Sequence, residues 1–354
     1  MWLTTRTGRL LAIAAGALVG ALMAILVWRG NPGHMGICGA CFLRDIAGAV
    51  GLHRAAPVQY VRPEVVGVVL GALFAALAAR EFRARGGASP LFKFLLGAWV
   101  SIGALVFLGC PFRMLQRLGG GDLNALVGAG GLVVGIGVAL ALVRTGTSAG
   151  RSSPAPAAVG LFLPLVLAGL LAALLLKPAG IAFSAKGPGS QHAPWLLSLG
   201  VGLAAGVAFQ RVRFCTLGAF RNAVFYRDFH LMSALVALVV AYGVVSAATG
   251  RFHLGMENQP IAHTSTPWNF LSMILVGLAA SLAGGCPVRQ MVLAGEGDTD
   301  AVATILGMVV GGALAHNFNL ASSAAGPTFS GKVAVGIGLL FCVAAALAMR
   351  GRRE

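Results

Sequence analysis

Cys110-Pro111-Phe112-Arg113 stands at the end of an apolar run, and 176 residues later the chain repeats it as Cys286-Pro287-Val288-Arg289. Six residues after each arginine comes a second matching string, Gly-Gly-Gly-Asp at 119–122 and Gly-Glu-Gly-Asp at 295–298. The cysteine, proline, arginine, outer glycines and aspartate all fall in register. A repeat of this kind indicates that the chain contains two copies of one unit.

A second pair of turns supports the same division. Cys38 is followed after six residues by Arg44, and Cys215 is followed after six residues by Arg221, at an offset of 177 residues. Each copy therefore carries two turns that combine a cysteine with an arginine.

The composition indicates an integral membrane protein. Of the 354 residues, 58% are hydrophobic and only 10% are charged, whereas soluble domains carry about a quarter charged residues. The formal net charge is +16, but the cations lie in loops between apolar runs, and no basic stripe with interleaved aromatic residues occurs. This distribution argues against nucleic-acid binding and is typical of topology signals that also attract anions.

Ten apolar runs come close to the length of about 17–25 residues that crosses a bilayer core. They are 10–28, 64–80, 93–109, 123–143, 158–176, 195–209, 231–249, 268–284, 300–315 and 333–349. The first lacks a cleavage site and is predicted to be retained. With the N-terminus inside, 16 of the 26 Lys and Arg residues fall on the inner side, so the positive-inside rule predicts that both termini are cytoplasmic.

Ten spans in two copies give five spans per copy. Because an odd number of spans ends on the opposite side of the membrane, the second copy has the inverted orientation. We therefore predict an all-α polytopic membrane protein of two inverted five-helix repeats, with short re-entrant broken helices that carry the cysteine turns. The first repeat covers 1–150 with the Cys38/Cys41 and Cys110 loops, and the second covers 151–354 with the Cys215 and Cys286 loops.

The Cys-Pro strings predict where helices break. Proline cannot continue a helix but is favoured at the first position of a new one, so Cys110 and Cys286 are predicted to cap short helices at about 112–118 and 288–294. A helix N-terminus inside the membrane presents free N–H groups and a positive partial charge, which favour an anion.

The arginines and thiols of these turns form the predicted site. Intramembrane arginine commonly marks a pathway or a buried partner, while thiols are soft, weakly hydrated groups suited to a sulfur- or selenium-bearing anion. The substrate-contacting candidates are Cys38, Cys110, Cys215, Cys286, Arg44, Arg113, Arg221 and Arg289.

Cys41 and His34 are secondary candidates, from the loop that contains a Cys-x-x-Cys. The second copy has Gly218 where Cys41 falls, so Cys38 is the better candidate of the pair. Zinc would need a second close pair or histidine partners, and we therefore predict no metal and no cofactor.

The cysteine turns resemble those of the YeeE/YedE sulfur-transport family, and most closely its YedE-type selenium transporters. The matching segments are GICGACFLRD (36–45), LHRAAPVQYVRPE (52–64), GCPFRM (109–114), RFCTLGAFRN (213–222) and GGCPVRQM (284–291). The resemblance implies an hourglass of broken helices in the bacterial inner membrane, uptake of thiosulfate or a selenium compound, and path cysteines at Cys38, Cys110 and Cys286. It also implies a cytosolic sulfur- or selenium-carrier partner of the TusA/SirA type.

Two other functions stay open. The chain could be a membrane thiol oxidoreductase that uses Cys38/Cys41 as a dithiol, or a membrane partner that hands sulfur or selenium to a cytosolic carrier without translocating it. No phosphate-binding G-x-x-x-x-G-K-[ST] string occurs, so we expect a transporter rather than an enzyme, and one that does not itself use ATP.

Overall fold

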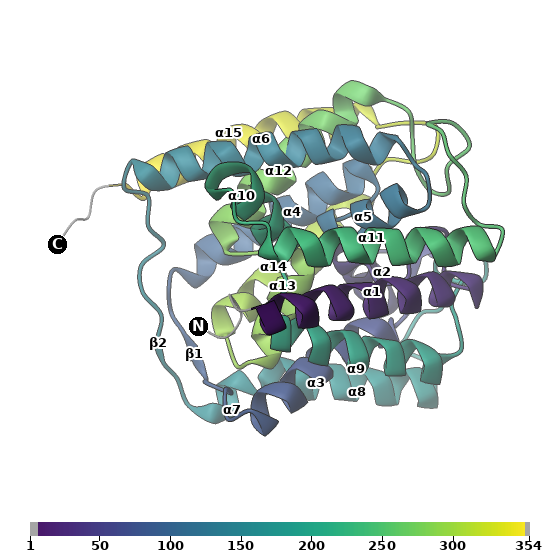
Figure 1. Cartoon of the computed structure of the whole chain (residues 1–354), viewed down its shortest axis with the longest axis horizontal. Helices are drawn as coiled ribbons and strands as arrows, with labels where there is room; N and C mark the ends of the chain where they lie inside the picture. The colour runs from purple at the N-terminus through teal and green to yellow at the C-terminus, as the bar shows by residue number, and fades with distance from the viewer. Residues whose placement is uncertain (1–5, 351–354) are drawn as a thin grey trace.

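The structure, a computed structural model, describes residues 6–350. Within this range nine helical stretches are long and apolar enough to cross a membrane. They contain α1 (Arg6–Trp28), α3 (Pro63–Ala78), α4 (Pro90–Phe107), α6 (Asn124–Arg144), α9 (Trp195–Val212), α11 (His230–Ala248), α12 (Thr266–Ala283), α14 (Thr299–Asn317) and α15 (Phe329–Ala348) (Figure 1). The remaining predicted run, 158–176, corresponds to a shorter apolar helix, α8 (Phe162–Leu176). The predicted all-helical, polytopic membrane fold is confirmed.

The remaining elements are short. Four of them interrupt the long helices inside the bundle, namely α2 (Gly39–Ala49), α5 (Pro111–Gly119), α10 (Thr216–Tyr226) and α13 (Pro287–Gly295). The others are the 3-10 turn η2 (Ala56–Val58), α7 (Ala157–Gly160) and the strands β1 (Arg85–Gly86) and β2 (Ser153–Pro154). The two strands pair antiparallel, with Arg85 opposite Pro154 and Gly86 opposite Ser153.

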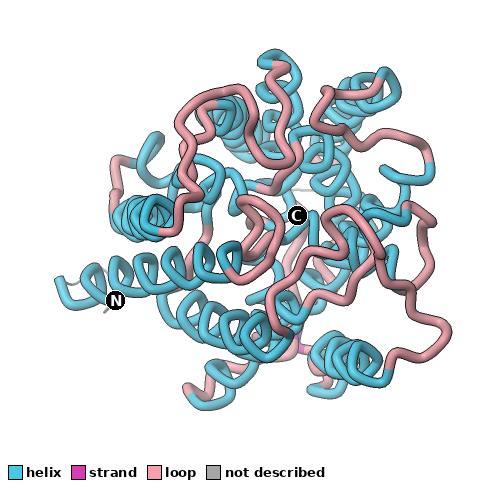
Figure 2. Tube along the Cα trace, turned by 90° about the vertical axis from the view of Figure 1, so that its right-hand side faces the viewer, coloured by secondary structure: helices cyan, strands magenta, loops and turns pink. Residues whose placement is uncertain are grey.

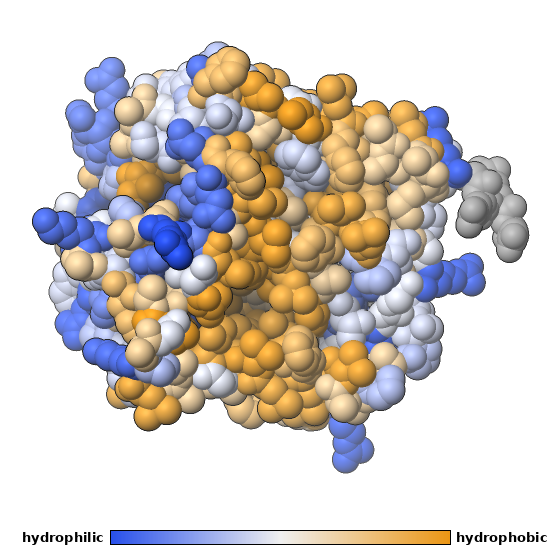
Figure 3. Space-filling view, turned by 180° about the vertical axis from the view of Figure 1, so that it is seen from behind, coloured by the Kyte–Doolittle hydropathy of each residue, from blue (hydrophilic) through white to orange (hydrophobic). Residues whose placement is uncertain are grey.

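The outer surface of the bundle is apolar around its middle. Large hydrophobic side chains are exposed on the helices, among them Leu176, Val244, Phe329 and Leu340. Figure 3 shows hydrophobic residues, in orange, as a band between two ends that carry hydrophilic residues, in blue. Exposed apolar surface of this extent is stable only against lipid.

The two ends of the bundle differ in what covers them. The strand end, at the left of Figure 1, holds β1, β2 and the start of α1. The loop end lies opposite and carries the long connections 29–38, 177–194 and 249–265, which face the viewer in Figure 2. Helix α15 ends at the strand end, where α1 begins. Residues 1–5 and 351–354, and with them the termini predicted to be cytoplasmic, lie outside the described residues.

Helices from the two halves of the chain pack against each other in pairs. Helix α1 lies along α11, and α3 lies along α9. In the first pair a Cβ on Gly16 would lie 2.1 Å from the carbonyl oxygen of Ala234, and a Cβ on Gly20 would lie 2.2 Å from that of Leu238. These two positions must be glycine, because only the missing side chain allows the backbones to come this close.

The other two pairs are α4 with α14 and α6 with α12. Two pairs of elements that match in the sequence repeat also match in length, since α4 and α12 have 18 residues each and α5 and α13 have nine each. The last predicted spans of the two copies pack differently, with α8 on α3 and α15 on α12 and α4. The inverted relation of the copies and the boundary at residue 150 stay predictions.

Candidate functional site

Four short helices begin directly after a cysteine. Cys38 is the N-cap of α2, Cys110 of α5, Cys215 of α10 and Cys286 of α13. The two Cys-Pro caps were predicted, and the observed helices exceed the predicted ranges by one residue at each end. All four candidate thiols therefore stand where helix N–H groups are free.

Local sequence explains why the chain breaks before Cys110 and Cys286. Leu108 is the C-cap residue of α4 and Gly284 is that of α12, and both residues adopt the left-handed conformation, with φ of 62° and 104°. Each new helix then starts at the proline after the cysteine. The left-handed conformation is unfavourable by about 1–2 kcal/mol for Leu108, because its Cβ crowds the backbone. Gly284 has no Cβ and avoids this cost.

The other two cysteines cap their helices through sulfur. Cys38 Sγ accepts from the backbone N–H of Cys41, and Cys215 Sγ accepts from that of Gly218, both at 3.4 Å. These thiols replace the hydroxyl or carboxylate that usually satisfies the first turn. The caps hold both sulfurs beside a helix N-terminus.

The cysteines lie together in two pairs. Cys38 Sγ and Cys110 Sγ are 3.7 Å apart, and both residues are fully buried. The thiols of Cys215 and Cys286 are also hydrogen-bonding neighbours. The six cysteines of the chain are free thiols.

The two pairs meet in the middle of the bundle. The start of α2 touches the start of α13, where a Cβ on Gly39 would lie 2.4 Å from Cβ of Pro287. Helix α13 also contacts α5, and α5 contacts α10. The four short helices are therefore in contact with one another, and a glycine lies where α2 meets α13.

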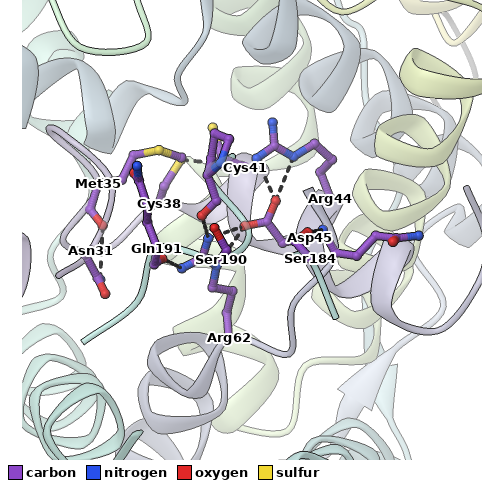
Figure 4. Close-up of polar contacts among 12 residues, drawn as sticks. Asn31, Met35, Cys38, Cys41, Arg44, Asp45, Arg62, Ser184, Ser190 and Gln191 are labelled. Atoms are coloured by element: carbon purple, nitrogen blue, oxygen red, sulfur yellow. Dashed lines mark hydrogen bonds and ion pairs between the residues drawn. The ribbon is translucent and has the colours of Figure 1, made fainter. Parts of the chain in front are cut away.

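At the loop end the predicted Arg44 is already neutralised. Asp45 Oδ1 lies 2.6 Å from Arg44 Nη2, and Asp45 Oδ2 lies 2.6 Å from Arg62 Nη2. Figure 4 shows the three side chains pointing toward one another. Arg62 also donates to the carbonyls of Pro188 and Gln191 at 2.8 and 3.1 Å. The triad joins α2 and α3 to the 177–194 connection.

Arg113 is equally occupied. Its guanidinium donates to backbone carbonyls of three segments, at His34 (3.2 Å), Gly33 (3.2 Å), Pro260 (3.4 Å), Ile261 (3.3 Å) and Leu108. Arg113 is fully buried. Its contacts stabilise the connections over α5, and no carboxylate pairs with it among the described residues.

The secondary candidates lie in the same region. Cys41 is buried in the first turn of α2. The His34 ring fills the space above Gly120, where a Cβ would lie 2.0 Å from its Cε1. Burial and, next, the charge of Arg113 lower the pKa of His34 to about 4. His34 is therefore neutral at pH 7.

At the strand end a cavity of about 300 Å³ reaches Cys215, one cysteine of the second pair. Its polar lining comes from Arg213, Cys215, Arg221, Ser281 and Arg289. Cys215 is half-buried, whereas Cys286 is fully buried. Two of the four predicted arginines, Arg221 and Arg289, thus face a space that a small anion could enter.

Arg213 and two carboxylates were not predicted. Arg213 donates to Glu296 Oε1 at 2.9 Å and to Glu81 Oε2 at 3.0 Å. The hydrogen bond from Gln210, followed by the nearby arginines, lowers the pKa of the Glu81 carboxyl. Arg213 stands two residues before Cys215. This short separation could have indicated a place in the site, but only arginines that recur in the repeat were chosen as candidates from the sequence. The described residues include no group of three or more His, Cys, Asp or Glu side chains able to hold a metal ion.

Comparison with known proteins adds one match. Residues 211–351 match a family model described as sulphur transport. The matched segment includes α10 to α15 and hence the turns at Cys215 and Cys286. No curated protein matches the chain. The YeeE/YedE sulphur transport family predicted from the cysteine turns is thus confirmed over residues 211–351.

Proposed function

We propose that this protein is a bacterial inner-membrane transporter that takes up a reduced inorganic sulfur or selenium anion, such as thiosulfate or a selenium species. The anion would pass from the loop end to the strand end by way of Cys38 and Cys110, then Cys286 and Cys215. The convergence of four cysteine-capped helix starts carries this proposal.

The chemistry of the convergence suits such an anion. Helix N-termini supply partial positive charge and N–H donors without a permanent cation on the path. Thiols supply soft contacts that a sulfur or selenium atom accepts, and they compete poorly with water for a hard oxyanion. Several weak sites in a row allow each one to release its ligand.

The arginines divide into two roles in this proposal. Arg221 and Arg289 line the strand-end cavity and attract the anion. Arg44 and Arg113 use their donors within the protein, so they position the turns of Cys38 and Cys110. In this proposal Arg44 and Arg113 therefore do not contact the substrate directly.

The proposed direction follows from charge. Many arginines lie at the strand end, in its connections and at the adjoining helix ends, including Arg80, Arg83, Arg85, Arg144, Arg151, Arg211, Arg213 and Arg227. An excess of this kind favours the cytoplasmic side. We therefore assign the strand-end cavity to the cytoplasm.

Uptake into proteoliposomes tests the function. Labelled thiosulfate and selenite are offered to the wild type and to the double variant Cys110→Ala/Cys286→Ala. We expect one of the anions to be taken up by the wild type and the double variant to lose at least about 90% of that uptake, because both thiol pairs lose a member.

Cys342→Ala is the matched control. Cys342 is also fully buried, but it lies within α15, so its loss should leave uptake unchanged. Size-exclusion chromatography shows whether each variant is intact. Full uptake by the double variant would exclude the thiol path, and no uptake of either anion by the intact wild type would exclude these substrates.

A further inference from the structure

The strand-end cavity has a carboxylate behind its arginines. Glu296 Oε1 accepts from Arg213 Nη1 at 2.9 Å and lies 3.5 Å from Arg289 Nη1. Its other oxygen lies 3.9 Å from Arg85 Nη2. The Glu296 side chain is 3% exposed. One buried carboxylate thus bridges two of the three cavity arginines.

The backbone holds Glu296 in this place. It is the C-cap residue of α13, and its carbonyl accepts from the N–H of Arg83 at 3.0 Å. Arg213 adopts the left-handed conformation at the end of α9, which turns the chain toward Cys215. The repeat pairs Glu296 with Gly120 in the first copy, so the carboxylate belongs to the strand-end turn alone.

The third cavity arginine is not neutralised. Arg221 Nε donates to the amide oxygen of Asn222 at 3.2 Å, and none of the ion pairs among the described residues includes it. Three guanidinium groups therefore line the cavity, and the buried Glu296 carboxylate pairs with two of them. The surplus of positive charge attracts an anion, and the carboxylate opposes it at the same two arginines.

We propose that Glu296 is an internal competing anion, which holds Arg213 and Arg289 when the cavity is empty and lowers the affinity for the transported anion enough for release. Arg213 becomes a further substrate-binding residue. The inference rests on the proposed function. It explains why a transporter would keep a carboxylate beside its anion site, since a path needs weak binding at the point of exit.

Equilibrium binding of labelled thiosulfate to the purified full-length protein provides the test, with labelled selenite as the second probe. Glu296→Gln keeps the size and one acceptor oxygen but removes the charge. We expect it to bind the anion about tenfold more tightly than the wild type, because two arginines lose their competing charge. In proteoliposomes the same variant should turn over more slowly at saturating anion.

Glu81→Gln is the matched control. Glu81 also pairs with Arg213, at 3.0 Å, but it does not reach Arg289 and its side chain is 38% exposed. Its removal should change the affinity by less than about twofold. Comparing Glu296→Gln with Glu81→Gln distinguishes two causes of a change in affinity. One is the loss of a negative charge beside the cavity, and the other is greater mobility of the Arg213 side chain.

Further variants keep the inference testable. Glu296→Ser also removes the charge and should give the same gain, even if the glutamine variant does not fold. Glu296→Asp keeps the charge and should stay within about twofold of the wild type. Unchanged or weaker binding by both neutral variants would overturn the inference while leaving the transporter proposal intact. A wild type that binds neither anion would overturn both.

Discussion

The cysteine turns of the two copies have similar backbone conformations but different surroundings. Helices α2 and α10 both have 11 residues, and both begin at a cysteine whose sulfur accepts an N–H at 3.4 Å. At the loop end both thiols are fully buried, while at the strand end Cys215 reaches a cavity. One repeated unit thus provides a closed site and an open site.

The arginines differ in the same way. Arg44 Nε donates to a carboxylate oxygen of Asp45 at 2.9 Å, and Arg221 Nε donates to the amide oxygen of Asn222 at 3.2 Å. The repeat places Asp45 opposite Asn222, so exchange of one oxygen for one NH2 group decides whether the arginine is neutralised. An arginine that recurs in a sequence repeat therefore need not keep its role.

The largest expected effect is loss of stability in Asp45→Asn. This change gives the loop end the residue found at the strand end, but it leaves Arg44 and Arg62 buried without a counter-charge. Breaking a buried ion pair on one side costs about 3–5 kcal/mol. We expect a lower thermal midpoint in detergent and less protein in the membrane.

Asp228→Asn is the control for that variant. Asp228 is exposed and accepts a hydrogen bond from Asn222 at 3.2 Å, so the same chemical change should alter the free energy of unfolding by less than about 0.5 kcal/mol. An Asp45→Asn protein as stable as the wild type would mean that the triad does not hold the loop end together.

A smaller effect is expected in the reactivity of the thiols. Cys215 lines the cavity, whereas Cys38, Cys110 and Cys286 are fully buried and react only when the structure opens locally. A hydrophilic maleimide should label Cys215 at least about tenfold faster than these three. Mass spectrometry of the labelled wild type resolves each cysteine without mutation.

Two additions sharpen the labelling experiment. The unfolded protein should label all cysteines at similar rates, which controls for peptide recovery. Thiosulfate should slow the labelling of Cys215 if the anion enters the cavity. Equal rates for Cys215 and Cys110 in the folded protein would contradict the contrast between an open and a closed site.

The parts of this arrangement that could be predicted are those fixed by neighbours in sequence. Pro111 and Pro287 stop one helix and start another, so the caps at Cys110 and Cys286 follow from local chemistry. The ten apolar runs follow in the same way from the length that a bilayer requires. The all-helical fold and the positions of these two cysteine caps were accordingly predicted.

What could not be predicted depends on distant segments. The carbonyls that accept from Arg113 come from 33–34 and 260–261 as well as from its own turn, and no local pattern specifies such partners. Asp45 beside Arg44 was a usable signal, because ionisable residues within the membrane commonly pair. The cavity and the contacts of Glu296 with the cavity arginines depend on tertiary packing.

The smallest expected effect comes from the reverse exchange, Asn222→Asp, which gives Arg221 the kind of neighbour that Arg44 has. Asn222 is half-buried and its side chain donates to the exposed Asp228 at 3.2 Å, so loss of this hydrogen bond and the new like charge should lower the free energy of unfolding by about 1 kcal/mol. The new carboxylate would neutralise part of the charge at the cavity, and the anion concentration for half-maximal uptake should rise about two- to threefold at low salt. Asn222→Gln, which adds no charge, is the control. The rise should vanish at high ionic strength, since salt screens exposed charges. A rise that persists in salt, or that Asn222→Gln reproduces, would show that position 222 acts through shape and not through the charge of Arg221.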